Sequence, residues 1–506
     1  MIAEPSFDAF AAAYADGTAQ IVRTALVGDL ETPVSAFLKL KAGASGPAFL
    51  LESVEGGAVR GRYSMIGLAP DLIWRCVGGT AEINRAAQVA PDAFQPCGAP
   101  PLEALRALLA ESAIAFPEGL PPMAAGVFGY LGYDMVRHME RLGPANPDVL
   151  GVPDAVLVRP TVMVVFDAVK DEIAVLVPVR PRPGVSARAA REAAQARIDA
   201  AVAAIEGPLP ADARAAAPDA AAGPSVSNTS AEEFRAMVAR AKEYIRAGDI
   251  FQVVLSQRFE ADFDLPAFAL YRALRRVNPA PFLCYLDFGT YQVVCSSPEI
   301  LVRVRDGKVT IRPIAGTRPR GVDAAADKAL ADDLLADEKE RAEHLMLLDL
   351  GRNDVGRVSR IGTVTVTDSF FIERYSQVMH IVSNVEGALD PRHDALDALV
   401  AGFPAGTVSG APKVRAMQII DELEKHKRGL YAGCIGYFGA NGEMDTCIVL
   451  RTAVVKDRRM YVQAGAGIVY DSDPASEQQE CVNKAKALFR AAEEAVRFAS
   501  SAGRGQ

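Results

Sequence analysis

The feature that most constrains this chain is a change of composition near its middle. From about residue 206 to 228 the sequence has few large apolar side chains and includes the run Gly-Pro-Leu-Pro-Ala-Asp-Ala-Arg-Ala-Ala-Ala-Pro. Such a segment cannot bury enough apolar surface to build a core and is typical of a linker. The 506 residues also exceed one ordinary domain. We therefore predict an N-terminal region over 1–205, a linker over 206–228 and a C-terminal domain over 229–500.

Strand and helix signals lie on both sides of this segment. Before it, Thr161–Phe166 and Ile173–Val179 are rich in Val and Ile and predict strands. After it, Ser230 followed by Glu233 is a capping-box signal that predicts a helix to about Ala247.

The C-terminal half continues this mixed pattern. A strand is predicted at Gln252–Ser256, and long helices at about 327–351 and 476–497. Two turn signals, the first at Asn441-Gly442, predict three strands in series between residues 434 and 470. Helices and antiparallel strands in one chain indicate an α/β fold of the α+β type.

The bulk composition excludes several classes of function. Half of the residues are apolar, as in a protein with a sizeable core, and the formal charge of −9 argues against nucleic acid as a ligand. We find neither a signal peptide nor an apolar stretch long enough to span a membrane. The seven cysteines are scattered, with no C-x-x-C pair. We expect no disulfide framework, no thiolate zinc site and a location in the reducing cytoplasm.

Two groups of carboxylates lie at helical spacing. Glu343 shares a face with Leu347 and Leu350, where an unpaired charge is costly. Glu480 and Lys484 share a face of the last predicted helix. From spacing alone, solvated helix faces with surface ion pairs are the favoured interpretation.

Eight sequence runs change that interpretation. Together and in this order they resemble the chorismate-utilising enzymes, and the six in the C-terminal half cover nearly all of residues 230–490. The runs are Leu50-Leu-Glu-Ser53, Gly129-Tyr-Leu-Gly-Tyr-Asp134, Pro313-Ile-Ala-Gly-Thr317, Asp337-Glu-Lys-Glu-Arg-Ala-Glu-His344, Asp349-Leu-Gly-Arg-Asn-Asp354, His380-Ile-Val-Ser383, Phe403-Pro-Ala-Gly-Thr-Val-Ser-Gly-Ala-Pro-Lys413 and Gln463-Ala-Gly-Ala-Gly-Ile-Val469.

The resemblance implies a fold and a metal. The fold has two packed antiparallel sheets flanked by helices, with an active cleft in the C-terminal half. Glu343 and Glu480 are the positions that would hold Mg²⁺, which bridges to the ring carboxylate of chorismate. Two carboxylates about 4 Å apart repel by roughly 4 kcal/mol at an effective dielectric constant of ~20, so a divalent cation suits the pair.

The resemblance also implies a set of substrate-binding residues. Arg451 would bind a carboxylate through both arms of its guanidinium. The alternative for Arg451 is a cross-strand salt bridge, and the alternative for the glycines is tight turns. The set is Gly316, Thr317, Tyr431, Arg451, Gly465, Gly467 and Lys484.

Catalytic roles follow from the same resemblance. Glu299 matches the family's general acid, a role that needs a carboxyl with a raised pKa. His380 matches a residue of the later elimination step, and Thr407 would face the site. Relatives that add water carry a lysine base where this chain has Gln252. Ammonia needs no such base, so Gln252 favours amination.

A further position selects between aminating relatives. Those that form 4-amino-4-deoxychorismate usually carry a nucleophilic lysine where this chain has Ala315. We therefore expect ammonia to attack C2 while the C4 hydroxyl leaves, and enolpyruvate to leave next. The products would be anthranilate and pyruvate, in the first step of tryptophan biosynthesis. The 4-amino-4-deoxychorismate-forming activity and a tryptophan sensor without catalysis are the alternatives.

Two expectations concern partners and regulation. The chain shows no glutaminase nucleophile, so the resemblance implies a glutamine amidotransferase subunit that supplies ammonia. It also implies a feedback site for L-tryptophan, although Ala280, Phe282 and Leu283 depart from the commoner Ser, Tyr and Met. The alternative without a binding role is a strand followed by a Pro-rich turn. The expected tryptophan-binding residues are Glu52, Ser53, Asn278, Pro279, Pro281 and Phe282.

Overall fold

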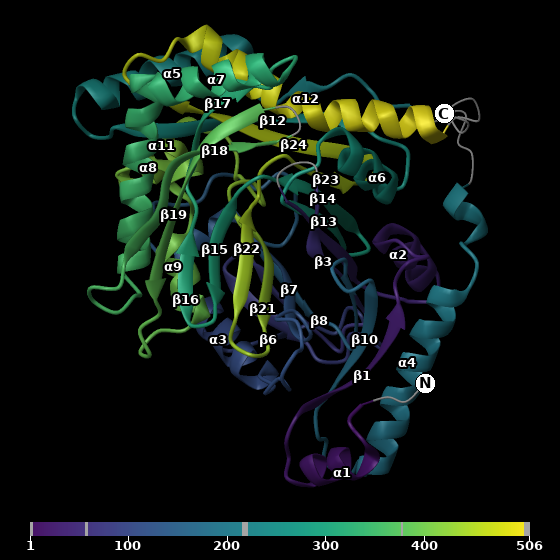
Figure 1. The fold of residues 1–506 in the computed structure, drawn as a ribbon. Helices are drawn as coiled ribbons and strands as arrows, with labels where there is room; N and C mark the ends of the chain where they lie inside the picture. The colour runs from purple at the N-terminus through teal and green to yellow at the C-terminus, as the bar shows by residue number, and fades with distance from the viewer. Residues whose placement is uncertain (1–3, 56–58, 215–220, 376–377, 500–506) are drawn as a thin grey trace.

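The computed structural model describes residues 1–506 except 1–3, 56–58, 215–220, 376–377 and 500–506 (Figure 1). Its framework is two large antiparallel sheets. The first runs in the order β1 (Gln20–Val27), β10 (Glu172–Val179), β9 (Val162–Asp167), β3 (Val59–Leu68), β2 (Ala48–Glu55), β13 (Phe282–Asp287), β14 (Tyr291–Ser297), β23 (Thr452–Lys456), β24 (Arg459–Ile468), β12 (Gln252–Asp262) and β11 (Val226–Ser227), with β20 (Gly410–Ala411) beside β12.

The second sheet also combines strands from the N-terminal and C-terminal parts of the chain. Its order is β17 (Ile314–Pro319), β19 (Val378–Ala388), β16 (Lys308–Ile311), β15 (Ile300–Arg305), β22 (Met444–Ile448), β21 (Cys434–Gly439), β7 (Gly126–Leu131), β8 (Ala155–Arg159), β4 (Leu72–Val77), β5 (Thr80–Asn84) and β6 (Gln95–Pro96), with β18 (Thr365–Arg374) on β19.

Each sheet contains strands from both sides of the predicted linker. In the first, β2 of the N-terminal region pairs with β13 of the C-terminal half. In the second, β7 pairs with β21. Whether residues 206–228 separate two folding units stays a prediction, but each sheet is continuous across the two halves.

The core lies between these sheets and under the helices. Phe49 of β2 stacks on Phe128 of β7 with ring centroids 4.7 Å apart, so side chains of the two sheets meet directly. α12 (Pro474–Ala499) packs on β24, and α5 (Ala231–Arg246) on β12. α8 (Glu338–Gly356) packs on β17 and β19. Helices α5, α7 (Ala324–Ala336) and α12 lie along the top of Figure 1. The predicted class, two packed antiparallel sheets flanked by helices, is confirmed.

Local predictions hold in part. The capping box at Ser230 and Glu233 is present and opens α5. The predicted single helix over 327–351 is wrong, because the chain breaks at Asp337. The Asp337 side chain accepts from the backbone amides of Lys339 and Glu340 and so begins a second helix, α8.

Two further predictions need correction, namely the number of strands after residue 434 and the scattering of the cysteines. Four strands, β21 to β24, occupy the region where three were predicted. Cys284 and Cys295 are opposed on β13 and β14, and Cys447 of β22 faces them from the other sheet. The three buried sulfur atoms lie within 4.8 Å of one another, so these cysteines are not scattered in space. Among the described helices, none is both long and apolar enough to cross a membrane.

Candidate active site

The first residues to converge are Gln252, Glu343 and Gly467. Gln252 opens β12, and its Nε2 donates to Oε1 of Glu343 on α8 over 2.9 Å. A methyl group built on Gly467 would lie 2.6 Å from that Nε2 and 3.9 Å from Glu343 Oε1. Only glycine allows β24 to approach the Gln252–Glu343 pair so closely.

Carboxylates from two helices gather beside this pair. Burial raises the pKa of Glu343, and the charges of Glu340 and Glu480 raise it further. Burial and Glu480 likewise raise the pKa of Glu477 on α12. The predicted metal ligands Glu343 and Glu480 are therefore close enough to repel. Glu343 is partly buried, whereas Glu480 is exposed and pairs with Lys484, and two such carboxylates offer the oxygen ligands that a hard cation such as Mg²⁺ prefers.

The number of protein ligands around that pair also suits Mg²⁺. In the described part of the chain, the only group of three or more Cys, His, Asp or Glu ligand atoms within 4.8 Å is the thiol group of Cys284, Cys295 and Cys447. Two glutamates without a third protein ligand leave coordination positions for water and a substrate oxygen, as Mg²⁺ prefers.

Three cationic or polar side chains lie next to the carboxylates. Lys484 Nζ is 2.6 Å from Glu480 Oε1 and donates to the Gly465 carbonyl over 3.0 Å. The Tyr431 hydroxyl also approaches this glycine, because a methyl group on Gly465 would lie 2.7 Å from it. Burial lowers the pKa of Arg451, while Tyr431 and Glu480 raise it.

Arg451 has the properties of an anion-binding residue. It adopts a φ of 48° between β22 and β23. Within the described chain it has no carboxylate at ion-pair distance, so the cross-strand salt bridge is wrong. A half-buried guanidinium without a counter-ion is costly, and an anionic ligand would offset that cost.

The glycines fall into two classes. Gly465 and Gly467 lie inside β24, opposite Ser256 and Val254 of β12, so they are not turn residues. Their role is close packing against the site. Gly316 has a φ of 70° at an irregularity in the pairing of β17 with β19, a conformation that favours glycine.

The predicted general acid is buried at one wall of the site. Glu299 follows β14 and is only 6% exposed. Thr407 Oγ1 donates to its Oε1 over 3.1 Å. Burial raises the pKa of Glu299 to about 8, so the carboxyl is mostly protonated at neutral pH. This is the state that a general acid needs.

His380 faces Gly316 and Thr317 from β19. Its Nδ1 lies 2.9 Å from the Gly316 carbonyl oxygen and 3.1 Å from Thr317 Oγ1. A carbonyl only accepts, so Nδ1 carries the proton and Nε2 is left as an acceptor. Burial lowers the pKa of His380 to about 4, which keeps the imidazole neutral.

The sequence interpretation missed a buried ion pair behind the site. Arg428 and Glu424 approach to 2.5 Å, with both side chains almost fully buried. Glu424 accepts from the backbone and hydroxyl of Ser256, and Arg428 donates to the carbonyls of Val408 and Val254. The pair therefore ties the segment of Thr407 to the strand of Gln252. Its only sequence signal is an i,i+4 spacing, which is typical of surface pairs.

The predicted tryptophan-binding segments also meet. Glu52 on β2 is directly opposite Leu283 on β13. The Glu52 carboxylate accepts from the Tyr271 hydroxyl over 2.5 Å and from Arg275 over 2.6 and 2.8 Å. Tyr271 and Arg275, both on α6 (Ala267–Val277), were not predicted.

The second segment, which begins at Asn278, is hydrogen-bonded to the chain just before the predicted general acid. Asn278 Nδ2 donates to Ser296 Oγ over 3.2 Å, and that hydroxyl donates to the Asn278 carbonyl over 2.5 Å. Ser296 stands three residues before Glu299. Pro279 and Pro281 lead from Asn278 into β13, which begins at Phe282.

Comparisons with known proteins identify the family of this chain. A model of the chorismate binding enzyme family matches residues 69–490. The chain is 59% identical to anthranilate synthase component 1 of Cereibacter sphaeroides over 99% of this chain and 100% of that protein. It is 49% identical to the component 1 of Pseudomonas aeruginosa, over 92% and 94%.

Solved structures show the same similarity. Anthranilate synthase component I from Streptococcus pneumoniae superposes with a TM-score of 0.74 at 38% identity, covering 92% of this chain and 99% of that one. The menaquinone-specific isochorismate synthase of Escherichia coli superposes with a TM-score of 0.70 at 21% identity, covering 94% and 95%, which supports the fold alone.

Proposed function

Because this chain belongs to the chorismate binding enzyme family, and within it to the anthranilate synthase component 1 proteins, we propose that it converts chorismate and ammonia to anthranilate and pyruvate. The observation that carries this proposal is the protonated, buried Glu299 in the same site as the unpaired guanidinium of Arg451. The first can protonate a leaving hydroxyl, and the second can hold an anionic substrate.

Binding of chorismate, a dicarboxylate, follows from the cations of the site. Arg451 presents a planar fork that matches one carboxylate. Lys484 and the Tyr431 hydroxyl add donors near Gly465. Thr317 and Gly316 line the ring from β17. Mg²⁺, held by Glu343 and Glu480, would neutralise the ring carboxylate and so polarise the ring toward attack.

The nucleophile is ammonia in this proposal. Gln252 is neutral and its amide N–H is already donated to Glu343, so it cannot remove a proton from water. Ammonia attacks C2 with its own lone pair and needs no base. Ala315 is buried and carries no amine, which disfavours the alternative route to 4-amino-4-deoxychorismate.

Two proton transfers complete the reaction. As the C2–N bond forms, the ring double bonds shift and the C4–O bond breaks, and Glu299 donates its proton so that water leaves. In this proposal His380 Nε2, the unprotonated ring nitrogen, accepts the C2 proton in the second step. The electrons of that C–H bond form the aromatic ring, and the C3–O bond breaks to release enolpyruvate, which becomes pyruvate.

The supply of ammonia calls for a second subunit. At neutral pH most free ammonia is ammonium, which has no lone pair. We infer that a glutamine amidotransferase subunit delivers ammonia to this chain. L-Tryptophan, as the end product, would bind at the junction of β2 and β13 and lower activity from there, a coupling between two separate sites.

One assay tests the activity. Chorismate, Mg²⁺ and an ammonium salt at high pH should give the fluorescence of anthranilate with the wild-type chain. Glu299→Gln keeps the shape of the side chain but has no acidic proton, and it should lose at least a hundredfold in kcat. Formation of 4-amino-4-deoxychorismate in place of anthranilate would contradict the proposal.

A further inference from the structure

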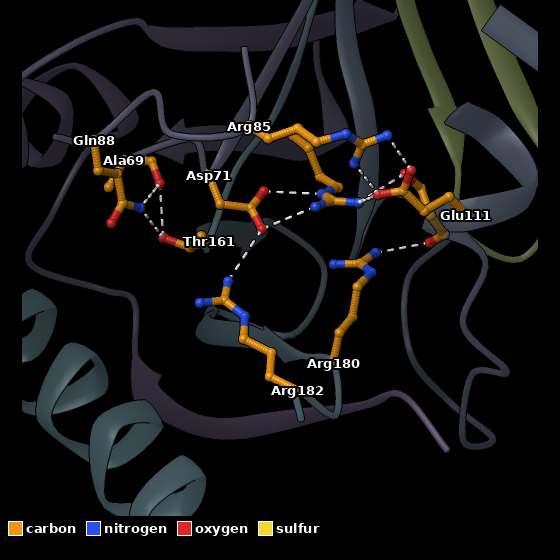
Figure 2. Close-up of polar contacts among 10 residues, drawn as sticks. Ala69, Asp71, Arg85, Gln88, Glu111, Thr161, Arg180 and Arg182 are labelled. Atoms are coloured by element: carbon orange, nitrogen blue, oxygen red, sulfur yellow. Dashed lines mark hydrogen bonds and ion pairs between the residues drawn. The ribbon is translucent and has the colours of Figure 1, made fainter. Parts of the chain in front are cut away.

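A cluster of arginines lies away from the active site, at the strand ends of the N-terminal region (Figure 2). We call it the arginine cluster. Arg159 ends β8, Arg180 directly follows β10, and Arg197 lies on α4 (Ala187–Glu206). Four of its members, Arg85, Arg159, Arg180 and Arg182, lie around Asp71 and Glu111. The fifth is Arg197, whose guanidinium is influenced by the charges of Arg182 and Asp71.

Three of the arginines contact the two carboxylates. Arg159 reaches Asp71 over 2.8 Å and Glu111 over 3.1 Å. Arg85 binds both oxygens of Glu111 over 2.7 Å. Arg182 is 3.7 Å from Asp71, at the limit of an ion pair. Three guanidinium groups thus share two carboxylates, and the other two arginines of the cluster pair with neither.

Arg180 and Arg197 have no counter-ion among the described residues. Arg180 Nη2 donates to the Ser112 carbonyl over 2.7 Å, but its buried Nε has no acceptor in the described chain. Burial and the charge of Arg159 lower the pKa of Arg180 to about 10. Arg197 is half-buried and makes no hydrogen bond or ion pair with the described residues. Burial and Arg182 lower the pKa of Arg197.

This excess of positive charge stands out because the whole chain carries −9. A partly buried cation without a counter-ion is destabilising, and removal from water makes it worse. Solvent screening cannot fully relieve Arg180, since its Nε is inaccessible. A bound anion would supply the missing counter-charge.

The geometry selects the kind of anion. Arg180 and Arg182 are two residues apart in the loop after β10, and in Figure 2 Arg182 extends to Asp71, while Arg180 reaches the Ser112 carbonyl. Arg197, on α4, lies near enough to Arg182 and Asp71 for their charges to act on its guanidinium. Guanidinium forks match oxyanions with several acceptor oxygens, and a phosphate near pH 7 carries close to two charges where a carboxylate carries one.

We propose that Arg180, Arg182 and Arg197 bind a phosphate group, either inorganic phosphate or a phosphomonoester. The site lies on α4 and on the loop between β10 and α4. None of these carries a residue of the active site, so phosphate binding here is separate from chorismate binding. It does not depend on the proposed reaction.

The test is thermal unfolding and calorimetric titration of the full chain with inorganic phosphate, against chloride at equal ionic strength. About 10 mM phosphate should raise the Tm of the wild type by roughly 2 °C or more. Arg180→Met and Arg197→Met should each weaken phosphate binding at least tenfold and leave the basal ammonium-dependent rate unchanged. Arg235→Met, which removes an exposed arginine on α5, is the control and should respond like the wild type.

The same variants distinguish a phosphate site from a purely structural role of the arginines. In buffer without phosphate, Arg180→Met should be at least as stable as the wild type, because it removes an unpaired cation. If Arg180→Met does not fold, Arg197→Met carries the test. Glycerol 3-phosphate in a parallel titration distinguishes the sources: tighter binding than phosphate assigns a phosphomonoester, and weaker binding assigns the free ion. No phosphate-specific shift in the wild type, or an equal shift in both variants, overturns the proposal.

Discussion

The Thr407 hydroxyl donates to Oε1 of Glu299 over 3.1 Å, and it is the group that most lowers the pKa of this carboxyl against the effect of burial. The two effects oppose each other at the general acid. The position of Thr407 therefore sets how far into the alkaline range Glu299 keeps its proton.

A pH profile tests this relationship. With a pKa of about 8, Glu299 is protonated below that pH and loses its proton above it, so kcat/KM should fall on the alkaline side of pH 8. Thr407→Val removes the hydroxyl and should move this limb upward, while Thr407→Ser should leave it in place. An alkaline limb that stays unmoved in Thr407→Val would show that another group titrates there.

The free energy of unfolding should depend on pH through the protonation of Glu299. Its pKa in the folded state lies above the ordinary value of 4.5, so the folded state binds the proton more tightly. Stability is then lost as pH rises from about 4.5 toward 8. Glu299→Gln cannot ionise, so urea unfolding at pH 9 should show it to be more stable than the wild type, with little difference at pH 5. A difference of equal size at both pH values would contradict this.

The metal prediction concerns Glu343 and Glu480. Glu343→Gln and Glu480→Gln each remove one charge that would face Mg²⁺, so activity at low Mg²⁺ should nearly vanish while circular dichroism stays unchanged. Glu493→Gln, on an exposed turn of α12, is the matched control. Near-normal turnover of either variant at low Mg²⁺ would rule out these ligands.

A nitrogen-source prediction follows from the missing glutaminase. The isolated chain should use ammonium with a rate that rises with pH, in step with the fraction of free ammonia. It should not use glutamine. Glutamine-dependent anthranilate formation by the purified chain alone would refute the inferred need for a second subunit.

The buried pair Glu424–Arg428 should matter for stability. Glu424→Gln leaves Arg428 buried without its counter-charge, which typically costs about 3–5 kcal/mol. Urea unfolding measures this cost, and Glu422→Gln, an exposed neighbour, should change it by less than about 0.5 kcal/mol. Replacing both members by apolar residues should recover part of the loss. A loss in Glu424→Gln no larger than in Glu422→Gln would mean the pair does not hold the site together.

These contacts mark the boundary of what the sequence predicts. The family resemblance assigned Glu299, Glu343, Arg451 and Lys484 to one site, because each matches a residue of the family's pattern. The pair Glu424–Arg428 lies at i,i+4 and the exposed pair Arg240–Glu243 at i,i+3, and burial is what distinguishes them. Spacing says nothing about which neighbours cover a helix face.

The sequence did not predict contacts between residues far apart in the chain, for a related reason. Arg275 reaches Glu52 across more than two hundred residues, and Cys284 and Cys447 meet only because two sheets face each other. The break at Asp337 was missed because its capping role competes with the apolar period that continues through both helices. Pairing between sheets is set by the whole fold, so a local pattern cannot reveal it.

The last prediction concerns inhibition by L-tryptophan. The two segments expected to bind it meet where Glu52 on β2 opposes Leu283 on β13, and Asn278 is bonded to Ser296, three residues before Glu299. A ligand at this junction can therefore affect the position of Glu299 through β14. We expect L-tryptophan to inhibit the wild type.

Ser53→Phe should weaken that inhibition at least tenfold, a change of about 1.4 kcal/mol in binding. A methyl group built on Gly61 would lie 2.4 Å from the Ser53 hydroxyl, so an aromatic ring at position 53 has no room on the side of Gly61. Uninhibited turnover should stay near normal, and Ser53→Ala, which adds no bulk, is the control and should remain inhibited. Equal inhibition curves for Ser53→Phe and the wild type, or no inhibition of the wild type at millimolar tryptophan, would place the regulatory site elsewhere or remove it.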